Sequence, residues 1–187
     1  MDRVGQKSYR GLVGQLLHMA SWSHPEISNT VREVSRHGHR CTTKHVKAAK
    51  KIAAFIWQTP HQGWTLRPNR KWDGKDRTFK FKISGKSDSN YAMRVDTRKS
   101  VTGYVVYLED APVAVKSLMQ KIIALSVTEA ELIALVQCVQ EMFCVKKVLE
   151  SMGLKVELPM LVECDNKGAV DLVNGHSVNI LMFVFCM

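Results

Sequence analysis

The chain has 187 residues, of which 45% are hydrophobic, and this composition is typical of a globular protein and argues against general disorder. No apolar run approaches the ~20 residues that cross a bilayer, and the first residues lack the apolar segment of a secretory signal. The five cysteines form no CxxC pair, so neither a disulfide framework nor a zinc site is indicated. We therefore expect no membrane contact and a cytoplasmic or nuclear location.

The net charge of +10 is unevenly distributed along the chain. Residues 1–78 carry 15 Lys/Arg and 5 Asp/Glu, a difference of +10, whereas residues 79–187 carry 12 of each. Such asymmetry favours contact between the first part of the chain and a polyanion such as nucleic acid. The alternative, a basic surface without a nucleic-acid partner, stays open.

Residues 8–57 show the apolar spacing of three helices. Thr42 or Thr43 is placed to cap the third of them, because its hydroxyl can accept an otherwise unpaired backbone N–H. That helix would carry three lysines on one face, Lys44, Lys47 and Lys51. These lysines could follow the phosphates of a nucleic acid or form an ordinary solvated helix face, and the sequence leaves both open.

The second half of the chain follows a different pattern. Residues 64–78 are polar and are predicted to be a linker between domains. From residue 79 the spacing predicts three strands in hairpins, a long helix from about Thr128 to Met152, a strand over Pro159–Cys164 and a further helix from about Gly168 to Asn174. This order is typical of an α/β domain with a mixed sheet.

Three acidic residues flank these elements. Asp88 and Asp165 stand at the C-terminal ends of two predicted strands, and Glu131 lies in the first turn of the long helix, which Ser126 or Thr128 could cap. If the first and fourth strands are neighbours and the helix packs across them, the three carboxylates can converge. Carboxylates that share a pocket repel each other unless cations such as Mg²⁺ bind there. Alternatively, Glu131 is an ordinary first-turn acid favoured by the helix dipole.

The chain also contains a series of ordered motifs that resemble the copia-type LTR retrotransposon Pol polyprotein, at the end of its reverse transcriptase and in the ribonuclease H (RNase H) domain that follows. The match runs from about Tyr9 to Asn179. The motifs are YRGLVGQLL at 9–17, HPEI at 24–27, HVKAAKKI at 45–52, SDSNYA at 87–92, DTRKSVTGY at 96–104, ALSVTEAE at 124–131 and CDNKGA at 164–169.

The resemblance implies an RNase H-like α/β fold for residues 79–179, preceded by a helical end of reverse transcriptase in residues 1–63. It implies that Asp88, Glu131 and Asp165 are catalytic carboxylates that hold Mg²⁺ or Mn²⁺, two ions in all, and that the substrate is the RNA strand of an RNA–DNA hybrid. The upstream polymerase part of the same polyprotein is a further expected partner. Contacts to the strands are expected from Arg98, Lys99, Lys116 and Lys121, whose alternative role is that of exposed charges at strand ends.

The chain departs from the family pattern in several places. The polymerase palm with its paired aspartates is absent, so no DNA synthesis is expected, and Asn90 replaces a second aspartate of the family's SDADWA run. Residues 180–187 form a divergent tail where the family has a further acidic region, a strand and a helix. We therefore expect a C-terminally truncated domain from a decaying element, with a genuine terminal strand as the alternative. Two other outcomes stay open, a non-catalytic nucleic-acid-binding remnant and a product that does not fold stably.

Overall fold

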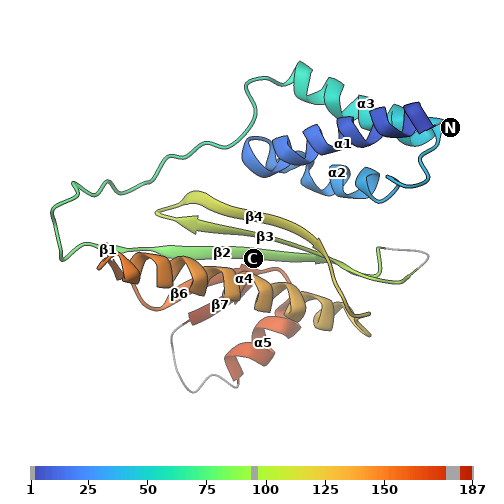
Figure 1. The fold of residues 1–187 in the computed structure, drawn as a ribbon. Helices are drawn as coiled ribbons and strands as arrows, with labels where there is room; N and C mark the ends of the chain where they lie inside the picture. Colours follow the sequence, from blue (N-terminus) through green and yellow to red (C-terminus); the bar gives the residue numbers. More distant parts are fainter. Residues whose placement is uncertain (1–2, 94–96, 176–181, 187) are drawn as a thin grey trace. The chain divides into compact units, whose positions relative to one another are not determined.

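The chain folds into two units, Met1–Trp64 and Thr65–Met187, which we call the helical unit and the sheet unit. A computed structural model describes residues 3–93, 97–175 and 182–186 (Figure 1). Asp96, Asn179 and parts of the tail at 180, 181 and 187, which entered the sequence interpretation, lie outside the described residues. None of the described helices is long and apolar enough to cross a membrane.

The helical unit contains the three expected helices. They are α1 (Arg3–Trp22), α2 (Ser28–Ser35) and α3 (Thr43–Gln58), with a short 3-10 turn, η1 (Pro25–Ile27), before α2. Their apolar faces form one core, in which Tyr9, Val31 and Ala49 are almost inaccessible to solvent. Thr42 is the N-cap of α3, and its backbone N–H donates to Nδ1 of His45 at 3.1 Å.

The sheet unit is built on five strands in the order β4-β3-β2-β6-β7. The hairpin strands β2 (Ile83–Asn90), β3 (Val101–Leu108) and β4 (Ala111–Met119) are antiparallel neighbours. On the other side of β2, β6 (Met160–Cys164) and then β7 (Met182–Cys186) add in parallel. The strands β1 (Lys80–Phe81) and β5 (Lys155–Val156) form a separate parallel pair. This is the RNase H-like fold with a mixed sheet that the resemblance implied.

Two helices complete the sheet unit. The helix α4 (Val127–Ser151) packs across β2 and β3, and α5 (Lys167–Gly175) packs against β6 and β7 (Figure 1). The apolar core lies between α4, α5 and the sheet and includes Ile83, Val106, Met142 and Val162. The strand β7 corresponds to the alternative of a terminal strand in the tail.

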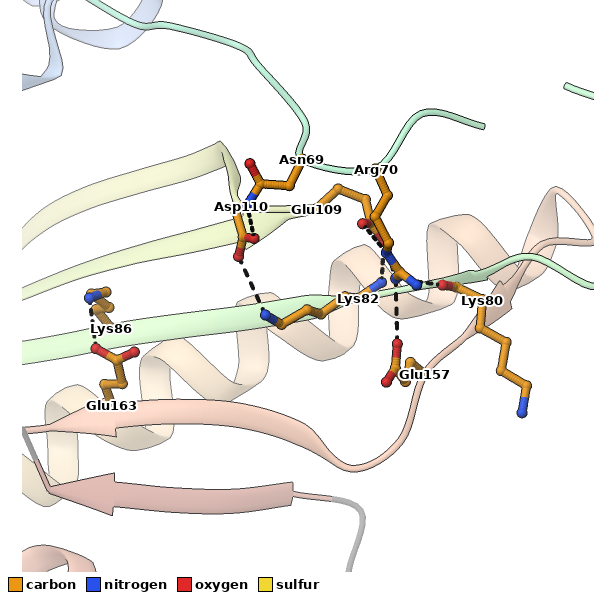
Figure 2. A network of polar contacts seen from close by, with 9 residues as sticks. All are labelled: Asn69, Arg70, Lys80, Lys82, Lys86, Glu109, Asp110, Glu157 and Glu163. Atoms are coloured by element: carbon orange, nitrogen blue, oxygen red, sulfur yellow. Dashed lines mark hydrogen bonds and ion pairs between the residues drawn. The ribbon is translucent and has the colours of Figure 1, made fainter. Parts of the chain in front are cut away.

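The segment before β1 makes specific contacts with the sheet unit. Both oxygens of the Glu109 carboxylate accept hydrogen bonds of 2.7 Å from the guanidinium of Arg70, which also donates to the Lys80 carbonyl at 2.9 Å and reaches Glu157 at 3.4 Å (Figure 2). The backbone N–H of Asn69 donates to the Glu109 carbonyl at 2.8 Å. Part of the sequence-predicted linker is therefore tied to the turn between β3 and β4.

That turn is conformationally unusual. Glu109 and Asp110 have φ angles of 52° and 64°, in the left-handed region that tight hairpin turns require and that non-glycine residues rarely adopt. Glu109 is also only 3% exposed, so its carboxylate needs partners. Burial raises the pKa of Glu109, but the hydrogen bonds from Arg70 and the Lys82 amide outweigh it, and the pKa lies below the usual 4.5. Arg70 thus stabilises the turn.

We expect Arg70→Ala to lower the free energy of unfolding of the sheet unit and hence its urea midpoint, because the buried Glu109 carboxylate loses its charged partner. Arg70→Lys should recover only part of this loss, because an ammonium group cannot form the two-pronged contact. The exposed Arg67, changed to alanine, is the matched control. Urea titration measures the unfolding free energy of all three variants, and hydrogen exchange of the β3 and β4 amides locates the change.

The loss of stability caused by Arg70→Ala should depend on pH. The depressed pKa of Glu109 means that its contribution is fully present above about 4.5 and disappears as the pH falls through the folded-state value. The stability difference between the native chain and Arg70→Ala should therefore be largest near neutral pH and shrink in acid. A difference that does not change between pH 7 and pH 3 would contradict this account of Arg70.

A second prediction concerns Gly85, where α4 approaches the middle of β2. A Cβ added at Gly85 would lie 2.6 Å from Cys138 Sγ and 2.8 Å from Met142 Sδ, too close for either contact. We expect Gly85→Ala to cost about 1–3 kcal/mol of unfolding free energy through overpacking. Gly103→Ala on β3 is the control, because its Cβ meets nothing nearer than 3.9 Å. Equal losses in urea denaturation would show that the close helix–strand approach is not the cause.

Candidate active site

The N-terminus of α4 separates the roles of two neighbouring glutamates. Ser126 is the N-cap, and its hydroxyl accepts a 3.1 Å hydrogen bond from the Glu129 amide. Glu129 in return accepts the Leu125 amide at 2.7 Å, which completes a reciprocal capping arrangement. Glu129 is therefore the first-turn acid that serves the helix end. Glu131, one half-turn later, is free of that role and is only 3% exposed.

The carboxylate of Glu131 reaches across to the end of β2. Its Oε1 accepts hydrogen bonds from the Ser89 amide at 3.1 Å and from the Ser89 hydroxyl at 2.7 Å. Its Oε2 accepts a long contact of 3.8 Å from the Cys164 thiol. Ser89 thus holds one carboxylate oxygen in place, while the other lies beside the end of β6.

The pKa of Glu131 is raised above its usual value. Burial is the main cause, and the negative charges of Asp165 and Asp88 add to it, while the two hydrogen bonds from Ser89 act in the opposite direction. A buried carboxylate near two others is costly in its charged form. A bound cation would remove that cost.

Asp88 and Asp165 come from adjacent parallel strands. The register pairs Ser87 with Cys164, so the residue that follows each of these two is one of the aspartates, and both aspartates are exposed at the same end of β2 and β6. The sequence-based condition that the first and fourth strands be neighbours beneath the long helix is therefore met. Asp88 lies within β2 rather than after it.

The structure brings two of the three expected acids into one group. Ligand atoms of Glu131, Cys164 and Asp165 all lie within 4.8 Å of one another, the one such group of His, Cys, Asp or Glu side chains among the described residues. Asp88 does not belong to this group, although its charge acts on Glu131. The geometric centre of the site is thus the Glu131–Asp165 pair, with Asp88 beside it.

The chemistry of these donors fits a hard divalent cation. Carboxylate oxygens are the ligands that Mg²⁺ takes from proteins, usually one or two together with waters and substrate phosphate. Burial raises the pKa of the Cys164 thiol, which therefore keeps its proton and is a poor ligand for such an ion. Asp165 and Glu131 would hold the ion, with Asp88 near enough to contribute charge.

Two residues that the sequence analysis did not assign to the site support it. Ser89 fixes Glu131, as described above. Gln120 is 1% exposed, and its amide donates to the Ala130 carbonyl at 2.9 Å and to Thr102 Oγ1 at 3.2 Å, which ties the start of α4 to the sheet. Ser89 lies in the SDSNYA motif, but no spacing rule connects Ser89 with Glu131 or Gln120 with Ala130.

The basic residues expected to contact nucleic acid are distributed over both units. Arg98, Lys116 and Lys121 are exposed and Lys99 is half-buried, in the segment before β3, on β4 and just after β4. Lys44, Lys47 and Lys51 are exposed on α3. No ion pair with an acid is seen for these seven within the described ranges, so their charges are available, and their contact with nucleic acid stays a prediction.

Comparison with known proteins identifies the relatives of this chain. It is 33% identical over 164 residues to the retrovirus-related Pol polyprotein from transposon RE1 of Arabidopsis thaliana, and 32% identical over 164 residues to that from transposon TNT 1-94 of Nicotiana tabacum. Each match covers 88% of this chain. The chain is homologous to part of the Pol polyproteins of copia-type retrotransposons.

The matched region is a small part of those relatives, since the chain spans about a tenth of the RE1 and TNT 1-94 polyproteins, 10% and 12%. No family model matches the chain. Among solved structures, the chain is similar to LC11-RNase H1, crystallised in complex with an RNA/DNA hybrid, with a TM-score of 0.42 and 13% sequence identity over 57% of this chain and 85% of that one.

The cluster of Glu131, Asp165 and the neighbouring Asp88 predicts that the sheet unit binds a divalent metal ion. Millimolar Mn²⁺ or Mg²⁺ should stabilise the sheet unit by mass action, by about 1.4 kcal/mol at tenfold over the dissociation constant. Asp165→Asn should remove most of this gain, and Asp171→Asn, an exposed acid on α5, is the matched control. Thermal unfolding with and without EDTA measures the shift. An equal shift in the native chain and Asp165→Asn would place the ion elsewhere.

Proposed function

We propose that the sheet unit is a metal-dependent endoribonuclease that hydrolyses the RNA strand of RNA–DNA hybrids. The observation that carries the proposal is the convergence of Glu131 and Asp165, with Asp88 beside them, at one end of two parallel strands in a homologue of retrotransposon Pol proteins. An arrangement of this kind suits phosphodiester hydrolysis, in which negative charge develops on a substrate that is already anionic.

The residues of the chain have separate roles in this proposal. Ser89 donates two hydrogen bonds to Glu131 Oε1 and so orients the carboxylate toward Asp165. Asp165 and Asp88 are exposed and would face the scissile phosphate from the strand ends. Divalent ions, when bound, would supply an activated water and neutralise charge on the phosphate. The exposed Lys116 and Lys121 would contact the backbone of the hybrid, whose 2′-OH groups and groove shape distinguish it from DNA.

A second candidate function is nucleic-acid binding without cleavage. It is favoured by the position of Asp88 outside the Glu131–Asp165 group and by Asn90, which stands where the resembling family has a second aspartate. The excess of positive charge in residues 1–78 would then carry the binding. Association of the chain with a polymerase segment of the same polyprotein is a further proposal that both candidates share.

We expect the native chain to cleave a labelled RNA–DNA hybrid with Mg²⁺ or Mn²⁺, and EDTA to abolish cleavage. Asp165→Asn, Glu131→Gln and Asp88→Asn should each reduce the rate at least about 100-fold, because each removes charge that the ions and the phosphate need. Asp171→Asn should cleave as the native chain does. A DNA duplex of the same sequence should stay intact.

The outcomes separate the two candidates. Cleavage that persists unchanged in all three site variants would rule out the carboxylate site. Absence of cleavage by the native chain, with hybrid binding that weakens as salt rises, would establish the binding function instead. Absence of both would contradict both candidates.

A further inference from the structure

The outward face of α3 carries lysines and a tryptophan on one line. Ala49, Ile52 and Ile56 of this helix are buried in the core of the helical unit. On the opposite side, Lys47, Lys50, Ala54 and Trp57 recur at steps of three, four and three residues, which places them on one face of a helix with 3.6 residues per turn. All four are exposed. We call these four residues the α3 stripe; Lys44 and Lys51 are also exposed on this helix.

The lysine charges of the α3 stripe do not stabilise the fold. The helix α3 contains no acid, and its first turns are lysine-rich, where positive charge opposes the helix dipole. Lys47 also has lysine neighbours at i+3 and i+4, which repel it. Within the described part of the chain, no ion pair with an acid is seen for the lysines of α3. The lysines of α3 therefore destabilise the helix without a compensating contact in the fold. Their charges are available to an external anion.

The aromatic end of the stripe is equally unexplained by packing. Trp57 is 87% exposed, more than any other large hydrophobic side chain described. Its ring borders an apolar hollow of about 660 Å³ between α1 and α3, lined also by Leu12, Met19 and Ala53. The ring is two helical turns from Lys50, about 10 Å along the helix axis. A flat ligand could therefore lie on Trp57 while its anionic part reaches the lysines.

We propose that the α3 stripe is a binding site for single-stranded nucleic acid, in which Lys47 and Lys50 contact phosphates and Trp57 stacks on a base. A basic track combined with an exposed aromatic ring is the arrangement by which proteins hold single strands without sequence preference. A duplex would offer phosphates but no free base face. This site lies in the helical unit, so it makes specific the nucleic-acid binding proposed above for residues 1–78 and is independent of the proposed cleavage by the sheet unit.

An anionic membrane fits the surface less well. A helix that lies in a lipid interface inserts a broad apolar face. The apolar face of α3 is already buried against α1 and α2, and the large apolar side chains that α3 still exposes, Trp57 and Phe55, do not form such a broad face. Charge complementarity together with one stacking ring favours a strand of bases and phosphates.

The test is binding of fluorescein-labelled dT20 to the full chain, by anisotropy, in EDTA and at several salt concentrations. DNA and the absence of divalent ions exclude cleavage by the sheet unit. Trp57→Ala should weaken binding about 5- to 150-fold, the range expected for one stacked base. Trp22→Ala is the matched control, because Trp22 is 76% exposed in the same unit but lies on α1. It should bind as the native chain does.

The lysines are tested by the salt dependence. Lys47→Gln with Lys50→Gln should reduce the slope of log affinity against log salt by about 1.4, because two phosphate contacts are lost. Lys71→Gln with Lys75→Gln removes the same charge from exposed positions in the sheet unit and should leave the slope nearly unchanged. Circular dichroism confirms that each variant folds.

Three results would overturn the proposal. The first is an equal loss of affinity for dT20 in the Trp57 and Trp22 variants, or an equal change of salt slope in the two lysine pairs. Either would show that the binding is not specific to the α3 stripe. The second is a dT20–dA20 duplex that binds as tightly as dT20 and is as sensitive to Trp57→Ala. The third is binding to phosphatidylserine vesicles, with the same dependence on Trp57, when dT20 does not bind.

Discussion

The parallel pairing of β2 with β6 is the contact on which the sheet unit depends. These strands are far apart in the sequence, and their union requires α4 to pass over the sheet between them. That passage is close, because Gly85 leaves no room for a side chain beneath Cys138 and Met142. The pairing places Asp88 and Asp165 at one end of the sheet, and the close approach of α4 brings Glu131 to the same end. Core packing and site geometry therefore share one cause.

The buried Glu131 shows how the fold manages an unfavourable group. A carboxylate with 3% exposure and two like charges nearby is unfavourable unless it is hydrogen-bonded. Ser89 donates two hydrogen bonds to this carboxylate, one from its backbone amide and one from its hydroxyl. The neighbouring Glu129 accepts a hydrogen bond from the Leu125 amide and helps to cap the helix. Two glutamates separated by one residue thus have unrelated physical tasks.

The Arg70 contact follows the same rule at the other end of the sheet. A left-handed turn and a buried acid, each unfavourable alone, occur together at Glu109, and Arg70 and Asn69 meet the needs of both. At Glu109 the opposite charge comes from Arg70 (Figure 2). At Glu131, by contrast, the neighbouring charges of Asp165 and Asp88 have the same sign as its own. The difference is physically informative. An acid paired with an arginine stabilises the fold, whereas a group of like-charged acids is the feature on which the proposed cation site rests.

Much of this could be predicted from the sequence because the signals are local. Helical spacing, the alternation of buried residues along β2, and the caps at Thr42 and Ser126 depend on neighbours within a few positions. The motifs that resemble copia-type Pol proteins added the RNase H-like fold and the three acids. The structure confirmed that fold, and the assignment of catalytic roles to Asp88, Glu131 and Asp165 stays a prediction.

Only the tertiary structure decided the rest, because it depends on contacts between distant residues. Strand register and helix placement bring Ser89 to Glu131 and Arg70 to Glu109. They also place Cys164, rather than Asp88, in the group with Glu131 and Asp165. The sequence by itself determined which residues favour helix, strand and charge. The folded chain determined which of them meet, because burial and long-range pairing set those distances and no local spacing can.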